Sequence, residues 1–202
     1  MAYVEASVRR RQLVAAARSA LAQEGVARTS LRAVAAEAGV PLGTMQYVFP
    51  SKEALLRAVI EDVVDDIVEV LRGTAEVDRG LEHAIRQGLA AFWDQLVSGH
   101  VSLQMMQYEL TMYALRTAGQ EELARWQYER YTAIVAEWFE RAAHHAGETC
   151  AVPFDRLGRI TVAALDGLIL QHVCDPDRAR SRTDLADVVE MIVRLADVRP
   201  AG

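Results

Sequence analysis

Residues 30–49, SLRAVAAEAGVPLGTMQYVF, contain two short segments with a helical pattern of apolar residues, one on each side of Gly39. Thr29 or Ser30 is suited to cap the first segment, because either hydroxyl can accept a bond from a free backbone N–H. Gly39 permits the left-handed conformation that ends a helix, and Pro41 fits the first turn of the next helix, where a missing N–H costs nothing. The stretch therefore predicts two helices joined by a tight turn.

The second of these helices, from about Pro41 to Tyr47, is too short to be stable alone. Met45, Val48 and Phe49 are expected to anchor it to a core. The other positions then face outward, and a short helix that presents its N-terminal residues suits the major groove of DNA. These outward residues are Leu42, Gly43, Thr44, Gln46 and Tyr47.

Charge is distributed unevenly along the chain, which has a formal net charge of −6. Residues 1–56 carry seven basic and four acidic side chains, and residues 57–202 carry 15 basic and 24 acidic side chains. A basic N-terminal region on an acidic body fits a DNA-contacting module carried by a domain that does not touch DNA, although an ordinary solvated surface would show this small imbalance about as often.

Apolar residues along the rest of the chain recur at spacings of three, four and seven, which indicates helices. Ser51 is expected to cap one of them, and Ser181 with Asp184 to form a capping box before the last. Strand signals are absent, so we expect an all-α protein of about nine helices. Their predicted ranges are about 6–24, 30–38, 41–47, 51–72, 78–98, 100–117, 120–146, 154–174 and 182–197.

Composition places the chain among globular proteins, with 202 residues of which 51% are hydrophobic and 25% charged. No uninterrupted apolar stretch approaches the roughly 18 residues that a membrane span requires, and residues 1–11 lack the apolar region of a signal peptide. Cys150 and Cys174 have no CxxC spacing, so reduced thiols are the default. We expect a cytoplasmic protein without a membrane partner.

The N-terminal region resembles the TetR family of bacterial transcriptional regulators from about Leu13 to Ile60. The matching residues are the alanine-rich helix ending in Glu24-Gly25, then Thr29-Ser30-Leu31-Arg32, Val34-Ala35, Glu37-Ala38-Gly39-Val40, Gly43-Thr44, Phe49 and Ser51-Lys52-Glu53-Ala54-Leu55-Leu56. The segment AALDGLILQ, residues 163–171, also resembles members with a BetI-like body.

The resemblance implies a homodimer with two kinds of domain. We expect a DNA-binding domain at residues 1–52, with its helix-turn-helix motif at 30–49, and a ligand-binding and dimerisation domain at 53–202. The partner implied for the first domain is a double-stranded, pseudo-palindromic operator. The partner implied for the second is a small-molecule inducer.

Family DNA contacts carry over onto matching positions of this sequence. Lys52, the only lysine of the chain, resembles the family's phosphate-clamping lysine. Gln46 stands where the family usually has tyrosine and Val48 where it often has histidine, and a glutamine can read an adenine edge. A solvated helix face is the alternative for these exposed positions. The predicted DNA-binding residues are Arg28, Thr29, Ser30, Pro41, Leu42, Gly43, Thr44, Gln46, Tyr47 and Lys52.

Most of the large aromatic residues lie between residues 92 and 139, on or beside a methionine-rich helix. Methionines and aromatics between helices can line an adaptable cavity for a small hydrophobic or aromatic molecule, although an ordinary core is the alternative. Glu109 and Arg116 would set the polarity of such a cavity. The predicted ligand-binding residues are Trp93, Met105, Met106, Tyr108, Glu109, Met112, Tyr113, Arg116, Trp126 and Tyr131.

The helix expected at 154–174 is apolar on two sides, and the last helix carries a matching stripe. A symmetric four-helix interface formed by these two helices of each subunit would cover both faces. Gly167 would allow a close crossing. The predicted interface residues are Ile160, Ala164, Gly167, Leu168, Val188 and Ile192.

Signals for catalysis or metal binding are weak. His144 and His145 are adjacent and so point about 100° apart on a helix, which suits one metal ion poorly. No phosphate loop, nucleotide fingerprint or nucleophile elbow occurs, so we expect no metal, cofactor or enzymatic activity. The sequence predicts a repressor released from its operator by a small hydrophobic molecule. A helical enzyme or carrier that has lost DNA binding, and an activator or nucleoid-type binder without an inducer, are the rival hypotheses.

Overall fold

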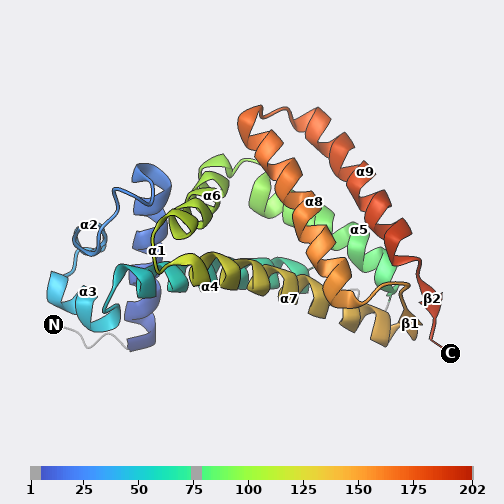
Figure 1. Ribbon diagram of the computed structural model, residues 1–202, viewed down its shortest axis with the longest axis horizontal. Coiled ribbons are helices and arrows are strands. Elements are labelled where there is room, and N and C mark those ends of the chain that lie inside the picture. The colour runs from blue at the N-terminus through green and yellow to red at the C-terminus, as the bar shows by residue number, and fades with distance from the viewer. Residues whose placement is uncertain (1–5, 74–78, 202) are drawn as a thin grey trace. The chain divides into compact units, whose positions relative to one another are not determined.

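The computed structural model describes residues 6–73 and 79–201, which are mainly helical (Figure 1). Contacts divide the chain into two compact units. The first unit comprises residues 1–63 and 102–127, and the second comprises residues 64–101 and 128–202. These divisions fall inside helices, so the domain boundary after residue 52 remains a prediction.

The first unit contains α1 (Ala6–Glu24), α2 (Leu31–Glu37), α3 (Leu42–Val48), the start of α4 (Lys52–Gly73), nearly all of α6 (Val101–Arg116) and the start of α7 (Glu121–His145). In Figure 1, α1 stands beside α2 and α3. Apolar side chains from all these helices are buried in this unit. Among them are Leu13, Leu21, Val34, Met45, Phe49, Leu56, Met106, Leu110 and Leu123.

Helix ends in this unit follow the local sequence signals. The Ser30 hydroxyl accepts the Ala33 N–H at 3.2 Å and caps α2, and the Ser51 hydroxyl accepts the Ala54 N–H at 3.1 Å before α4. Gly39 has φ +65°, the left-handed conformation that ends α2. The predicted helix caps and turn of the N-terminal motif are therefore confirmed.

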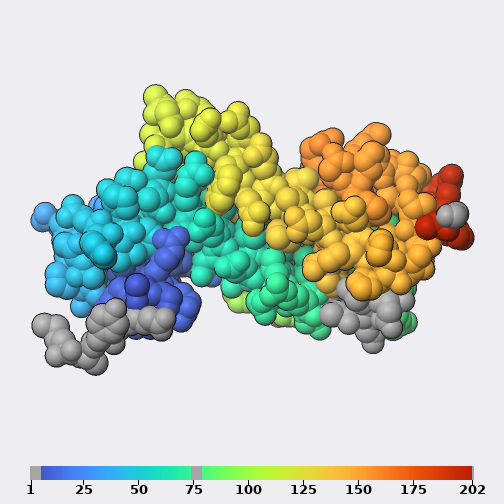
Figure 2. All heavy atoms as spheres, turned by 90° about the horizontal axis from the view of Figure 1, so that it is seen from below, coloured from blue at the N-terminus to red at the C-terminus, as the bar shows by residue number. Residues whose placement is uncertain are grey.

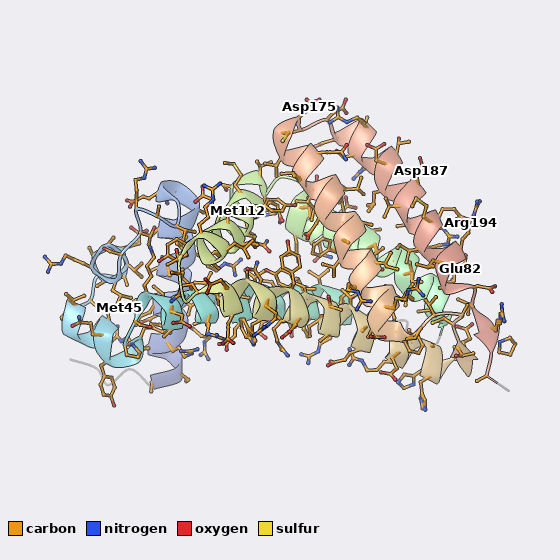
Figure 3. The ribbon with its side chains drawn as sticks, viewed as in Figure 1. Met45, Glu82, Met112, Asp175, Asp187 and Arg194 are labelled. Carbon is orange, nitrogen blue, oxygen red and sulfur yellow. The ribbon has the colours of Figure 1, made fainter. Side chains whose placement is uncertain are left out.

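The second unit contains the rest of α4 and α7, α5 (Leu81–Phe92), a π-helical segment η2 (Trp93–Val97), α8 (Phe154–Cys174) and α9 (Arg178–Ala196). α9 packs against both α8 and α5. Arg86 on α5 pairs with Glu82 at 2.8 Å and with Glu190 on α9 at 2.9 Å (Figure 3 labels Glu82). A two-residue antiparallel pair, β1 (Glu148–Thr149) with β2 (Arg199–Pro200), is an addition to the expected all-α fold.

The N-terminus of α9 differs from the prediction. Asp177 is the cap, because its carboxylate accepts the Ala179 and Arg180 N–H groups at 2.9 and 3.0 Å. Ser181 lies inside the helix and is buried, where its hydroxyl bonds to His172 Nδ1 at 2.9 Å. The predicted capping box of Ser181 and Asp184 was wrong, because the Ser181 hydroxyl is bonded to the buried His172 inside the helix and does not cap its N-terminus.

Two glycines of α8 have opposite surroundings. A methyl group on Gly158 would lie 2.9 Å from the Thr132 carbonyl oxygen and 3.0 Å from the Ala136 nitrogen, so α7 and α8 approach closely there. Gly167 is exposed, and a methyl group on it would meet nothing within 4 Å. The close crossing within the subunit is therefore at Gly158, and Gly167 faces away from the subunit's own core.

Among the described helices, α8 also has the length and apolar composition that a membrane span requires. Buried helices of water-soluble proteins meet the same criteria because they too need apolar surfaces. In this structure α8 packs along α9, and Leu157, Thr161 and Leu165 on α8 are buried.

Candidate DNA-binding surface and ligand cleft

α3 is anchored on one face and open on the other. Met45 is completely buried and Phe49 is 1% exposed, so they fix the helix to the first unit. Gln46 is exposed, and Tyr47 on the same outer face is 90% exposed. Figure 2 shows the light-blue atoms of this region on the outer surface of the first unit. The outer face of α3 is thus free to contact another molecule.

Most of the other predicted DNA-binding residues are exposed or half-buried in or beside α2 and α3, and Thr29 and Lys52 differ from them. Pro41, Gly43 and Ser30 are exposed, while Leu42 and Thr44 are half-buried. Arg28 is exposed, and its Nε donates to the Glu24 carbonyl at 2.8 Å, which holds the side chain against the end of α1.

Thr29 is only 3% exposed. Its hydroxyl donates to the Gly25 carbonyl at 2.9 Å, and its backbone N–H donates to the same oxygen at 3.2 Å. The hydroxyl is therefore occupied inside the module and is not open to a phosphate. We correct its predicted role to a structural one, in which Thr29 closes the turn between α1 and α2.

Lys52 also points inward. Its Nζ donates to the Val26 carbonyl at 2.6 Å and lies 4.8 Å from the centre of the Tyr113 ring on α6. Partial burial lowers the pKa of this ammonium from its ordinary value, because desolvation disfavours the charged form. The carbonyl and the ring face are the groups that hold the charge there.

Glu109 on α6 binds the same turn from the other side. Its Oε2 accepts the Val26 N–H at 2.9 Å. Gly25 has φ +80°, and a methyl group on it would lie 2.7 Å from Glu109 Oε2. The backbone conformation therefore favours glycine at this position, and an added methyl group would also displace the Glu109 carboxylate from its bond to Val26. Glu109 was predicted only to line a ligand cavity, and its bond to Val26 was not predicted, because no local pattern links residues 83 positions apart.

A cleft of about 450 Å³ opens between this turn and the C-terminal part of α6. Four predicted ligand-binding residues line it, and Figure 3 labels one of them, Met112. Met112 is 48% exposed, so its thioether is accessible. The full lining is Glu24, Gly25, Val26, Ala27, Arg28, Glu109, Met112, Tyr113, Arg116 and Thr117.

The other predicted ligand-binding residues do not join this cleft. Trp93 and Tyr131 belong to the second unit, where Trp93 packs edge-on against His172 and borders a separate cleft of about 310 Å³ between α5 and α9. Met106 is buried in the core of the first unit, and the Trp126 ring lies 5.2 Å below the Arg57 guanidinium. Met105 and Tyr108 line neither cleft.

Polar side chains that the sequence analysis did not single out are buried between α6 and α7. Thr111 is 6% exposed, and its hydroxyl donates to Gln127 Oε1 at 3.3 Å. Gln104, about two turns earlier on α6, is 4% exposed. The sequence signal that could have identified this cluster is the presence of polar residues in a helix that is itself predicted to be buried.

The predicted dimer residues occupy mainly the outer side of the α8–α9 pair. Ile160, Ala164, Leu168 and Val188 are half-buried, and Gly167 is exposed. Ile192 is 2% exposed, so it belongs to the subunit's own core and is removed from the interface set. Two apolar residues of these helices were missed although they are open to solvent, namely Leu170, 49% exposed, and Met191, 65% exposed.

Residues 13–59, which include α2, α3 and the turn between them, match the family described as "Bacterial regulatory proteins, tetR family". Residues 82–195 match the "Tetracyclin repressor-like, C-terminal domain". The chain belongs to the TetR family. Family membership agrees with the exposed outer face of α3. Among the described residues, no group of three or more His, Cys, Asp or Glu side chains is placed to hold a metal ion.

The chain is similar to a named repressor over most of its length, and to solved structures in its fold. The chain is 30% identical over 183 residues to the HTH-type nicotine-responsive transcriptional repressor HdnoR of Paenarthrobacter nicotinovorans, covering 89% of this chain and 90% of the relative. It is also similar in fold to a protein described as a "putative TetR-family transcriptional regulator from Rhodococcus sp.", with 18% identity, a TM-score of 0.76 and coverage of 94% and 99% of the two chains. The multidrug binding protein EbrR complexed with ethidium has 25% identity, a TM-score of 0.67 and coverage of 93% and 98%.

Proposed function

We propose that this TetR-family regulator is a repressor that binds a pseudo-palindromic operator as a homodimer and leaves it when a small hydrophobic or aromatic molecule binds. The observation that carries the proposal is the helix-turn-helix geometry, in which α3 is anchored by Met45 and Phe49 and exposes Gln46 and Tyr47. A helix held in this way can enter a major groove without unfolding. The protein is expected to act in the cytoplasm and to have no enzymatic activity.

The direct test is binding to DNA from the intergenic regions next to the protein's own gene. Fluorescence anisotropy with labelled duplexes is expected to show a salt-sensitive, sequence-specific complex containing two subunits. Equal affinity for every duplex at every salt concentration would contradict operator recognition. Nicotine and other amines that carry an aromatic ring are the first inducer candidates, because one relative is nicotine-responsive.

Gln46 is proposed to read one base. Replacing Gln46 with Ala is expected to cost about 1–3 kcal/mol of operator binding, because a side-chain amide can bond bidentately to an adenine edge. The loss is expected at a single position of the operator, with the variant no longer preferring one base there. Binding to a set of operators substituted at each position measures this preference.

Gln23→Ala provides the matched control, since Gln23 is an exposed glutamine on α1 that donates to Ser19 within the same helix. This control is expected to bind every operator as the wild type does. Equal base preference in Gln46→Ala and wild type would show that Gln46 makes no base contact.

The inducer is proposed to bind in the cleft beside α6, with its apolar body on Met112 and Tyr113. Met112→Ala is expected to reduce the thermal stabilisation that a bound ligand gives, because a ligand at a fixed concentration stabilises the folded state more when it binds more tightly. Met105→Ala is the matched control, since Met105 is an exposed methionine of α6 outside the cleft. Thermal shifts with lipophilic cations, aromatic acids and neutral hydrophobes measure the effect.

Variants of the charged lining distinguish the kind of ligand. Glu109→Gln is expected to weaken a cationic ligand, and Arg116→Gln an anionic one, because each removes the opposite charge. If every stabilising ligand bound Met112→Ala and Met105→Ala equally well, the inducer site would lie elsewhere. If stabilising ligands left operator affinity unchanged, the proposed release mechanism would be wrong.

A further inference from the structure

The turn between α1 and α2 is held from two directions by side chains of other helices. Glu109 on α6 accepts the Val26 N–H at 2.9 Å, and Lys52 at the start of α4 donates to the Val26 carbonyl at 2.6 Å. Val26 itself is 1% exposed. All of these residues belong to the first compact unit. We call Glu109, Lys52 and the Gly25-Val26 turn the latch.

The latch sets the starting point of the helix-turn-helix motif. The Gly25 carbonyl accepts both the hydroxyl and the N–H of Thr29, and Ser30 then caps α2. α2 packs in turn against α3. A displacement of the turn therefore changes where α2 begins and how α3 is presented.

We propose that Glu109 and Lys52 are positioning residues for DNA binding, and that Lys52 acts through the Val26 carbonyl instead of through a DNA phosphate. The ammonium already has an oxygen acceptor and an aromatic face, 4.8 Å away on Tyr113. Moving it to a phosphate would leave the Val26 carbonyl without its lysine donor. In this proposal Lys52 does not make the phosphate contact that the family resemblance implies.

The latch also connects the proposed ligand cleft to the helices that are proposed to bind DNA. Glu109, Tyr113, Gly25 and Val26 all line the 450 Å³ cleft, so a molecule in the cleft contacts the latch directly. This inference rests on the proposed repressor function. It identifies the group in that cleft on which an inducer would act, namely the Glu109 carboxylate that is bonded to Val26.

The first test measures the latch without DNA. Hydrogen exchange of the Val26 amide is expected to be faster in Glu109→Ala than in wild type, because the acceptor is removed. Glu109→Gln keeps an amide oxygen at that position and is expected to restore most of the protection. Glu109 is an exposed residue, so both variants leave the apolar core intact. Unchanged exchange in Glu109→Ala would overturn the latch.

The second test separates positioning from phosphate contact. Lys52→Met, which keeps the chain length and loses the donor, and Glu109→Ala are each expected to lower operator affinity by about 5–150-fold. The slope of log affinity against log salt concentration is expected to stay as in wild type. A lost phosphate contact would instead reduce that slope by about 0.9.

The two substitutions are expected to be less than additive in the double variant, because they act on one turn. Glu121→Ala, an exposed glutamate in the first turn of α7, is the control and should bind like wild type. A reduced salt slope in Lys52→Met, or wild-type affinity in both single variants, would overturn the proposal. If the wild-type protein bound no duplex, the repressor function would fail, while the exchange experiment would still decide the latch.

Discussion

A Gly167→Trp variant is expected to be a monomer at micromolar concentration and to lose nearly all operator affinity. Gly167 is exposed, and a methyl group placed on it meets nothing within 4 Å in its own subunit. An indole at this position is therefore expected to leave the subunit fold intact and to block the helix crossing that we propose between subunits. Losing the second recognition helix removes the avidity of two linked sites, which is about 10²–10⁴-fold.

Light scattering measures the subunit count of this variant, and anisotropy measures its operator affinity. Glu140→Trp, which places the same indole on the exposed side of α7, is expected to remain dimeric and to bind normally. Thermal unfolding of a dilute Gly167→Trp sample checks that the subunit is still folded. A Gly167→Trp variant that is dimeric and binds the operator normally would place the interface away from this part of α8.

Phe49→Ala is expected to abolish DNA binding by unfolding the helix-turn-helix module. Phe49 is 1% exposed, and the Arg10 guanidinium lies 4.9 Å from the centre of its ring. Removing a buried phenylalanine costs about 3–5 kcal/mol of stability, which is a large share of the roughly 5–15 kcal/mol that holds a domain folded. The α8–α9 surface lies in the other compact unit, so the variant should stay dimeric.

Tyr47→Ala is the matched aromatic control, two residues away and 90% exposed. Its stability is expected to stay within about 0.5 kcal/mol of wild type, because an exposed ring buries little apolar surface. Urea unfolding measures both variants, and light scattering measures their subunit count. A Phe49→Ala variant with wild-type stability would contradict the anchoring role.

Much of the helical fold could be predicted because its signals are local. Gly39 ends α2 in the left-handed conformation, and Ser30 and Ser51 cap the helices that follow them. The outer face of α3 was predicted from spacing alone, since Met45 and Phe49 turn inward at helical intervals and leave Tyr47 outside. Each of these features depends on residues within about one helical turn.

The candidate site was only partly predictable. Glu109, Met112, Tyr113 and Arg116 share a cleft, because they lie on neighbouring turns of one helix. Trp93 and Tyr131 were grouped with them by residue type, yet both belong to the other compact unit. Residue type records what a side chain can contact, and the packing of helices decides which side chains meet.

The sequence by itself determined the helices, the turn at Gly39 and the exposed face of α3, because backbone conformation and helical periodicity are short-range properties. Tertiary structure decided the roles of the polar side chains. Thr29 bonds to Gly25 within one loop, but Lys52 reaches Val26 from another helix, and Glu109 reaches the same residue from 83 positions away. A buried polar group must find a partner wherever the folded chain provides one, and sequence spacing does not record that choice.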